Sequence, residues 1–272
     1  MATITTAVQD ASANVGAPLV LEAVHDGVCT LTLNRGERFN PLSRDMIGAL
    51  ARVLARVGAD PSVRVVVIAG AGRGFSAGHD LRELRAHPDL EWQRALFAEC
   101  NDMMLALTRL AQPVIARVHG IATAAGCQLV AMCDLAVAAE DARFALPGVN
   151  VGVFCSTPAV GVARNVGRKR AMEMLLTGEP VDARTAQAWG LVNDVVPAAD
   201  LDGAVARRCA AIMAKSAAIV ALGKRAFYQQ VELPLGDAYC DMAEVMAGNL
   251  LEPDAAEGID AFLGKRAPRW HA

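Results

Sequence analysis

Several features that would direct a protein to a membrane or a nucleic acid are missing from this chain of 272 residues. No apolar segment is long enough to span a bilayer, because Arg117, His119 and Asp134 interrupt the richest one. Lys and Arg are scattered and form no basic run, and the formal net charge is −3. We therefore expect no membrane span and no nucleic-acid partner.

Cysteine pairs and metal-ligand spacings are missing as well. The 7 cysteines form no Cys-x-x-Cys pair, and their odd number indicates a reducing compartment. The 5 histidines do not pair with cysteines or carboxylates at metal-ligand spacing, so we expect no metal ion. The N-terminus lacks the residue order of a secretory signal. These features together predict a cytoplasmic location and a polar, mobile tail over residues 1–16.

What the chain does contain is a succession of strands and helices. Residues 19–24 and 28–33 flank Asp26-Gly27, which is the strongest short hairpin signal in the sequence. The β-branched run over residues 64–69 predicts a buried strand. Ser43 has the type and position of an N-cap for the helix that follows it.

From about residue 198 the patterns are only helical, with breaks at Ser216, Pro234 and Pro253. The fold class is therefore α/β, with a core over residues 17–197 and a helical region over residues 198–272.

Residues 119–134 hold the most unusual local pattern. A short apolar strand over residues 113–118 precedes a turn of small residues that ends at Gly126, and helical spacing follows. Small side chains let a ligand approach the backbone closely, and the first N–H groups of a helix have no partner within it. Such donors suit a phosphate or an oxyanion. The alternative is that the small residues only permit close packing of helix and strand.

A second glycine-rich turn, over residues 70–81, also follows a buried strand directly. It lacks the spacing of a phosphate loop or a dinucleotide-binding turn. It is either a second close approach to the backbone, with the N–H of His79 free, or an ordinary loop. Two such turns can supply two N–H donors to one oxygen, which is what defines an oxyanion hole.

Both turns resemble known motifs. Phe75-Ser-Ala-Gly-His-Asp-Leu81 and Ala124-Ala-Gly-Cys-Gln-Leu129 are similar to the hallmark motifs of the crotonase (enoyl-CoA hydratase/isomerase) superfamily. The stretches 173–179, 188–192 and 262–266 also resemble that family, so the similarity covers nearly the whole chain. More narrowly, residues 124–131 and 147–158 resemble the enoyl-CoA hydratase domain-containing protein 3 group.

The resemblance implies a spiral of ββα units and a C-terminal helical oligomerisation region, which forms a homotrimer or a hexamer built as a dimer of trimers. It implies an acyl-CoA substrate, with coenzyme A as part of the substrate and no other cofactor. The thioester oxygen would lie between the N–H groups of His79 and Ala125. Ala125 stands where the family usually has Gly.

The resemblance also implies a binding site for the rest of the acyl-CoA. Residues near the first motif would line it, and two C-terminal residues, from this chain or a neighbouring subunit, would reach the adenine or phosphate end. The implied set is Arg38, Phe39, Asn40, Ala77, Asp80, Leu81, Phe262 and Lys265. Lys265 is equally interpreted as a solvated helix end.

The two glutamates that family hydratases use are both missing here. Motif to motif, they fall on Gln128 and Gly148. An amide orients a water but does not take a proton near neutral pH, and glycine has no side chain. A general acid or base is worth about 10²–10⁴-fold in rate, so efficient hydration by the family mechanism is not expected.

Two hypotheses follow. The chain is an enoyl-CoA hydratase or isomerase-type enzyme of fatty-acid metabolism with atypical proton-transfer groups, or it is a CoA-thioester-binding protein with little turnover. The side chain of His79 has a suitable pKa for proton transfer, unless its ring faces solvent or Asp80. Cys155 lacks a basic partner nearby in sequence, which favours a packing role. Thioester hydrolysis is a third option.

Overall fold

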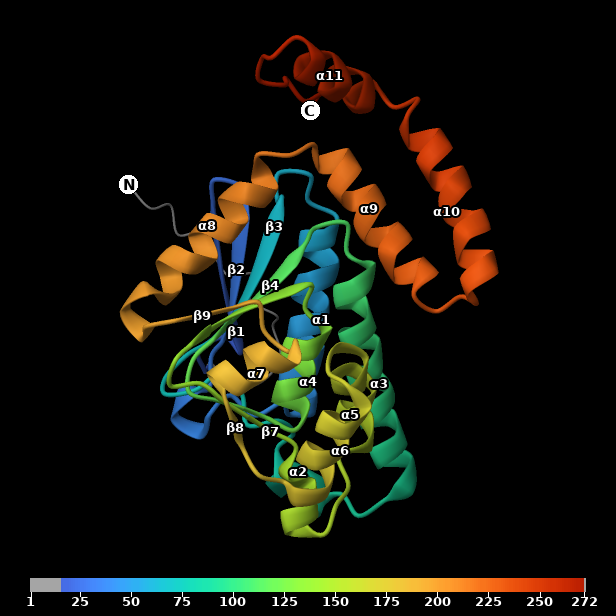
Figure 1. Ribbon diagram of the computed structural model, residues 1–272. Helices are drawn as coiled ribbons and strands as arrows, with labels where there is room; N and C mark the ends of the chain where they lie inside the picture. The colour runs from blue at the N-terminus through green and yellow to red at the C-terminus, as the bar shows by residue number, and fades with distance from the viewer. Residues whose placement is uncertain (1–15, 272) are drawn as a thin grey trace.

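The computed structural model describes residues 16–271 (Figure 1). Six strands form the main sheet in the order β1-β2-β3-β4-β6-β9, in which β1 and β2 are antiparallel and all other neighbours are parallel. They are β1 (Val20–His25), β2 (Val28–Leu33), β3 (Val65–Gly70), β4 (Val114–Val118), β6 (Leu135–Ala139) and β9 (Asp194–Val196). The expected tail over residues 1–16 lies outside the described residues except for its last one.

A second, smaller sheet has the order β5-β7-β8. Its strands are β5 (Ile121–Thr123), β7 (Arg143–Ala145) and β8 (Val181–Asp182). The small-residue stretch after β4 is therefore not one turn, since β5 pairs in parallel with β7 inside it. The sequence also predicts the following helix too late: α4 (Ala125–Met132) already begins at Ala125.

Helices of the body pack around these sheets. Besides α4 they are α1 (Arg44–Gly58), α2 (Leu81–Ala86), α3 (Leu90–Arg109), α5 (Ser156–Asn165), α6 (Arg168–Thr177) and α7 (Ala183–Trp189). Short 3-10 turns are η1 (Gly36–Arg38), η2 (Pro147–Val151) and η3 (Ala198–Asp200). Ser43 caps α1 as expected, because its Oγ accepts the N–H of Met46 at 3.2 Å.

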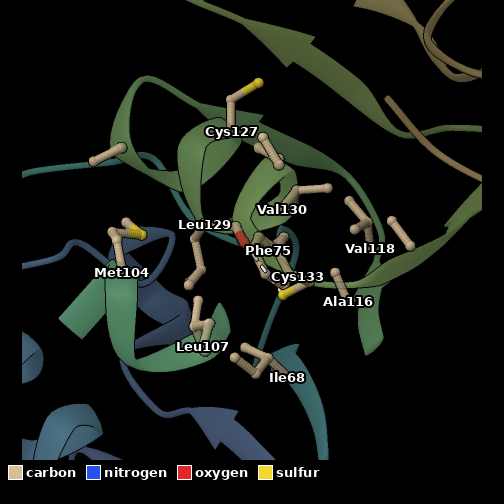
Figure 2. Packing of buried hydrophobic residues seen from close by; sticks show 14 of the residues in the cluster. Ile68, Phe75, Met104, Leu107, Ala116, Val118, Cys127, Leu129, Val130 and Cys133 are labelled. Carbon is tan, nitrogen blue, oxygen red and sulfur yellow. Dashed lines mark hydrogen bonds between the residues drawn. The ribbon is translucent and has the colours of Figure 1, made fainter. Parts of the chain in front are cut away.

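The hydrophobic core lies between the main sheet and helices α1, α3 and α4 (Figure 2). Leu129 of α4 faces Met104 and Leu107 of α3, and all three side chains are 2 % exposed or less. Burial of such a side chain contributes about 1.5–3 kcal/mol relative to leaving it exposed. The helix that begins at Ala125 is thereby held rigidly against α3.

The chain ends in four helices, which are α8 (Leu201–Met213), α9 (Ala217–Gln230), α10 (Leu235–Asn249) and α11 (Pro253–Leu263). Of these, α8 packs on the main sheet and α9 lies against α3, while α10 and α11 lead away from the body (Figure 1). Lys224 of α9 is buried and donates to the carboxylate of Asp134 at 2.6 Å, and Tyr228 donates to the same carboxylate at 2.9 Å. Asp134 also accepts the N–H of Val114 at 2.6 Å, so it ties the end of α4 to β4 and to α9.

Candidate active site

The two small-residue turns of the sequence lie side by side. Ser76 and Ala122 form a parallel bridge, and the N–H of Thr123 donates to the carbonyl of Ser76 at 2.9 Å. The hydroxyl of Thr123 donates to the carbonyl of Ala77 at 3.1 Å. The loop after β3 is therefore fixed against the segment that leads into α4. This contact is needed if both turns are to contribute to one site.

Two glycines permit this close approach. A Cβ at Gly126 would lie 2.3 Å from the carbonyl oxygen of Ser76. A Cβ at Gly78 would lie 2.8 Å from the carbonyl oxygen of Thr123 and 3.0 Å from the nitrogen of Ala125, and Gly78 has φ +85°. Both contacts are with backbone atoms, so neither position accommodates a side chain without a shift of the loops.

Two backbone N–H donors without acceptors in the described part of the chain lie on the two segments that meet at this junction. Ala125 is the first residue of α4 and is fully buried, and its N–H has no carbonyl within the helix to bond. Across residues 16–271, neither this N–H nor that of His79 donates to a protein acceptor. Donors of this kind, on two loops in contact, can both bind one oxygen of a ligand.

The residue before α4 has an unusual backbone conformation. Ala124 has φ +49° and ψ −120°, and its N–H donates to the carbonyl of Ala145 at 2.9 Å. These angles belong to the first central position of a type II′ turn, where glycine predominates. A residue with a side chain in such a region costs about 1–3 kcal/mol. The strain is located directly before the free N–H of Ala125.

The imidazole ring of His79 contacts Leu42 and Phe97. Its Nδ1 lies 3.1 Å from the carbonyl oxygen of Leu42, and its edge meets the ring of Phe97 at 5.3 Å between centroids. Burial lowers the pKa of the imidazole below its usual value. The hydrogen bond with the carbonyl of Leu42 raises the pKa, but by less than burial lowers it. Nε2 is buried and has no hydrogen-bond partner within the described residues.

Gln128, where the motif resemblance predicts the first family glutamate, lies on α4 and is 4 % exposed. Its Oε1 is buried and has no hydrogen-bond partner within residues 16–271. A buried acceptor without a donor costs about 1–3 kcal/mol, so its retention calls for a functional explanation. The side chain can accept a hydrogen bond from a ligand or a water, but it does not take a proton.

Gly148, where the motif resemblance predicts the second family glutamate, has no room for a side chain. A Cβ there would lie 2.5 Å from the carbonyl oxygen of Val153 and 2.9 Å from Sγ of Cys155. The N–H of Val153 donates to the carbonyl of Gly148 at 2.9 Å, which holds the loop in place. The thiol of Cys155 is buried and its pKa is raised, mainly by burial, so it remains protonated near neutral pH. This loop occupies the space that a glutamate would need.

Three of the residues assigned to CoA binding lie around η1. The guanidinium of Arg38 pairs with Asp80 at 2.6 Å, and Arg73 lies over the ring of Phe39 at 5.1 Å. Asn40, by contrast, is fully buried, and its amide donates to the carbonyls of Ala71, Gly74 and Phe75 at 2.9 to 3.0 Å. These bonds hold the loop after β3, and the placement of CoA along Asn40 stays a prediction.

The other assigned residues are divided between two ends of the molecule. Ala77 lies in the first loop, and Leu81 is 57 % exposed at the start of α2. Phe262 is 82 % exposed near the end of α11, and Lys265 follows that helix. Helices α11 and α2 lie at opposite ends of the molecule (Figure 1). Within one chain Phe262 and Lys265 do not reach the candidate site, so their proposed contact requires a neighbouring copy.

Sequence reasoning missed Leu42 and Val153, and it placed Phe97 only on the apolar side of a helix, as a pocket wall or as core. Leu42 and Val153 act through their carbonyl oxygens, which every residue type has, so residue identity gives no signal for them. Phe97 is an apolar residue at helical spacing, like any core residue. Across the described residues, 16–271, no group of three or more His, Cys, Asp or Glu is placed to hold a metal ion, and no helix is long and apolar enough to cross a membrane.

Comparisons with known proteins identify the family to which this fold and its two paired turns belong. The family model described as enoyl-CoA hydratase/isomerase matches residues 23–272. A crystal structure of an enoyl-CoA hydratase from Mycobacterium smegmatis is similar with a TM-score of 0.92 and 55 % identity, covering 94 % of this chain and 100 % of that one.

Two further relatives belong to one group. The enoyl-CoA hydratase domain-containing protein 3 of Xenopus laevis is 45 % identical over 253 residues, which is 93 % of this chain and 86 % of that protein. The crystal structure of the human protein of the same name has a TM-score of 0.90 and 42 % identity, with 93 % and 100 % coverage. The chain belongs to the enoyl-CoA hydratase/isomerase family, the crotonase superfamily, and its resemblance to the domain-containing protein 3 group is confirmed.

One expectation is overturned by these names. The Xenopus laevis relative is named mitochondrial, as are the Rattus norvegicus and Homo sapiens proteins of the same name. The predicted cytoplasmic location is therefore wrong. Its physical basis was weak, because unpaired cysteines indicate a reducing environment without distinguishing one reducing compartment from another.

Proposed function

We propose that this protein binds acyl-CoA or enoyl-CoA thioesters and stabilises negative charge on the thioester oxygen through the backbone N–H groups of His79 and Ala125. The observation that carries the proposal is the pair of partnerless donors on two loops that meet at Gly78. One preorganised oxyanion donor is worth about 2.7–4 kcal/mol in transition-state stabilisation. Charge on that oxygen develops when the α-carbon loses a proton to give an enolate.

The proposed chemistry is of the hydratase or isomerase type, without the family's pair of glutamates. Gln128 does not take a proton, and Gly148 offers no side chain. Each lost general acid or base costs about 10²–10⁴-fold in rate. Rapid hydration by the two-glutamate mechanism is therefore not part of the proposal.

A second candidate function is the binding of CoA thioesters with little turnover. The loop around Gly148 favours it, because the carbonyl of Val153 and the thiol of Cys155 fill the place of the missing side chain. In this case the oxyanion donors serve recognition of the thioester carbonyl and no proton moves.

The surroundings of the site complete the proposal. Arg38, Phe39, Ala77, Asp80 and Leu81 would lie along the CoA part of the substrate, and no further cofactor is needed. The C-terminal helices carry large exposed apolar side chains, among them Leu235, Tyr239, Leu251 and Phe262, which supports association into a homotrimer or hexamer. The names of the relatives support a mitochondrial location.

The test compares butyryl-CoA with S-butyl-CoA, a thioether that lacks only the carbonyl oxygen. Two hydrogen bonds of about 0.5–1.5 kcal/mol each correspond to a preference of roughly 5- to 150-fold for the thioester. Dissociation constants of both ligands are measured by isothermal titration calorimetry. Equal affinity of the wild-type protein for the two ligands would contradict the oxyanion assignment.

A pair of variants locates the donors. In Gly78→Ala the added methyl lies 3.0 Å from the nitrogen of Ala125, so the thioester preference is expected to disappear. Gly27→Ala is the matched control, because Gly27 has φ +78° against +85° for Gly78 but lies in the β1–β2 hairpin. It introduces similar backbone strain and should leave the preference intact. Thermal melting of both variants confirms that each remains folded.

A further inference from the structure

The ring of His79 is held in a single orientation and a single tautomer. A carbonyl oxygen only accepts hydrogen bonds, so Nδ1, at 3.1 Å from the carbonyl of Leu42, carries the proton and donates it. The edge-on contact with Phe97, with an interplanar angle of 80°, fixes the plane of the ring. In the neutral ring Nε2 then has a free lone pair.

This lone pair has no protein donor within the described residues, although the atom is buried. Burial lowers the pKa of the imidazole below its usual value of about 6.5, so the ring is neutral and accepts protons at pH 7. An unsatisfied buried acceptor costs about 1–3 kcal/mol, and such groups call for a functional explanation. The same residue contributes its backbone N–H to the proposed oxyanion site, so the ring lies within one side-chain length of it.

The other candidates for proton transfer near the site are unsuited to it. Gln128 is an amide, and the thiol of Cys155 stays protonated because burial raises its pKa. The carboxylate of Asp80 is paired with Arg38 and also caps α2 by accepting the N–H of Arg82. His79 is the one group in this set that is neutral, unpaired and able to take a proton.

We propose that Nε2 of His79 removes and returns a proton at the α-carbon of the bound thioester, an inference that rests on the proposed function. The α C–H bond breaks and its proton goes to Nε2. The electron pair of that bond forms the carbon–carbon double bond of the enolate, and the carbonyl π electrons move to the thioester oxygen.

Negative charge on that oxygen, held by the N–H groups of His79 and Ala125, stabilises the imidazolium that forms beside it, which offsets the effect of burial on the ring. The proton then returns from Nε2 to the α-carbon. In a 3-enoyl thioester it returns to the γ-carbon instead, which moves the double bond from the β,γ to the α,β position. No oxidant, reductant or further reactant is needed.

The experiment follows exchange of the α-hydrogens of butyryl-CoA in D₂O by mass spectrometry. His79→Asn keeps an amide N–H at the place of Nδ1 and lacks Nε2, while His79→Gln places an amide nitrogen near Nε2 that takes no proton. Both variants keep the backbone N–H. We expect wild-type exchange well above the protein-free rate and a decrease of about 10²–10⁴-fold in both variants. His25→Asn, an exposed histidine beside the β1–β2 hairpin, should exchange like wild type.

The outcomes separate this inference from the proposed function. The role of the ring would be overturned if His79→Asn or His79→Gln exchanged the α-hydrogens as fast as the wild-type protein. It would also be overturned if the wild-type protein preferred butyryl-CoA over S-butyl-CoA but did not exchange the α-hydrogens at all. Without that thioester preference the proposed function fails, and the inference fails with it. A slow variant that retains the preference for the thioester supports both.

Discussion

Ala124 offers a substitution whose effect on stability has an unusual sign. Its φ of +49° and ψ of −120° are accessible to glycine without strain, whereas the methyl group costs about 1–3 kcal/mol. Ala124→Gly should remove that strain. Replacement of Ala by Gly otherwise destabilises a folded protein, because glycine loses more conformational freedom on folding.

The magnitude combines three contributions. Relief of strain contributes about 1–3 kcal/mol, the added freedom of the unfolded chain costs about 0.4–1 kcal/mol, and loss of a half-buried methyl costs roughly 0.4 kcal/mol. The net change in the free energy of unfolding is therefore roughly 0–2 kcal/mol in favour of Ala124→Gly. For a domain of this size a gain of 1 kcal/mol raises the melting temperature by about 2–4 °C.

Ala51→Gly is the matched control. Ala51 is also half-buried but lies inside α1, where replacement by glycine costs about 0.5–1 kcal/mol from helix propensity in addition to the lost methyl. Its melting temperature should fall by about 2–6 °C. Both variants are measured by thermal melting at one protein concentration, since association alters the apparent stability. A drop of equal size in both variants would refute the strain at Ala124.

Two further predictions concern a loop and a pH dependence. Gly148→Ala should lower the free energy of unfolding by about 1–3 kcal/mol, because the added methyl would lie 2.5 Å from the carbonyl oxygen of Val153. The control is Gly223→Ala in the interior of α9, where the added methyl meets nothing within 4 Å and should stabilise the protein by about 0.4–1 kcal/mol. Urea titration of both variants checks that the two changes have opposite signs. Asp254 has its pKa lowered to about 2, chiefly by the backbone N–H of His271, against about 3.9 in the unfolded chain. Its stabilising effect is therefore present above about pH 4 and is lost as the pH falls toward 2. The difference in melting temperature between wild type and Asp254→Asn should shrink between pH 5 and pH 3, and a constant difference would contradict this assignment.

Local sequence signals were sufficient wherever the residue type itself sets the geometry. The hairpin forms as expected because Asp26 and Gly27, with φ of +46° and +78°, both adopt the left-handed region that a type I′ turn requires. Ser43 caps α1 through its own hydroxyl, and Asp182 and Gly190 begin and end α7. In each of these cases a side chain, or its absence, determines the local structure.

Structure that depends on distant pairing was not predictable in this way. Strands β5 and β8 have 3 and 2 residues and exist because they pair with β7, so no periodicity marks them. The helix α4 begins without a capping side chain, since Ala124 makes no side-chain hydrogen bond, and its start was therefore placed too late. The full burial of the Asn40 side chain, whose amide holds the loop after β3, also depends on distant segments and had no local signal.

The candidate site itself was located through the resemblance of two motifs, but its chemistry depends on contacts that the motifs do not contain. The carbonyl of Leu42 determines which nitrogen of His79 carries the proton. The carbonyl of Val153 leaves no room for a side chain at residue 148. Both constraints come from backbone atoms of segments outside the two motifs.

The two kinds of group in this site respond differently to substitution. The proposed oxyanion donors are backbone N–H groups, so they are present whether residue 125 is Ala or Gly and whatever side chain follows Gly78. Proton transfer depends on side chains, and the motif resemblance predicts that the family's two glutamates are replaced at Gln128 and Gly148. The proposed binding of a thioester is therefore expected to persist through changes that alter or remove its chemistry. This physical difference is why affinity for the carbonyl oxygen and exchange at the α-carbon must be measured separately, and why variants of His79 can lose the second property while they keep the first.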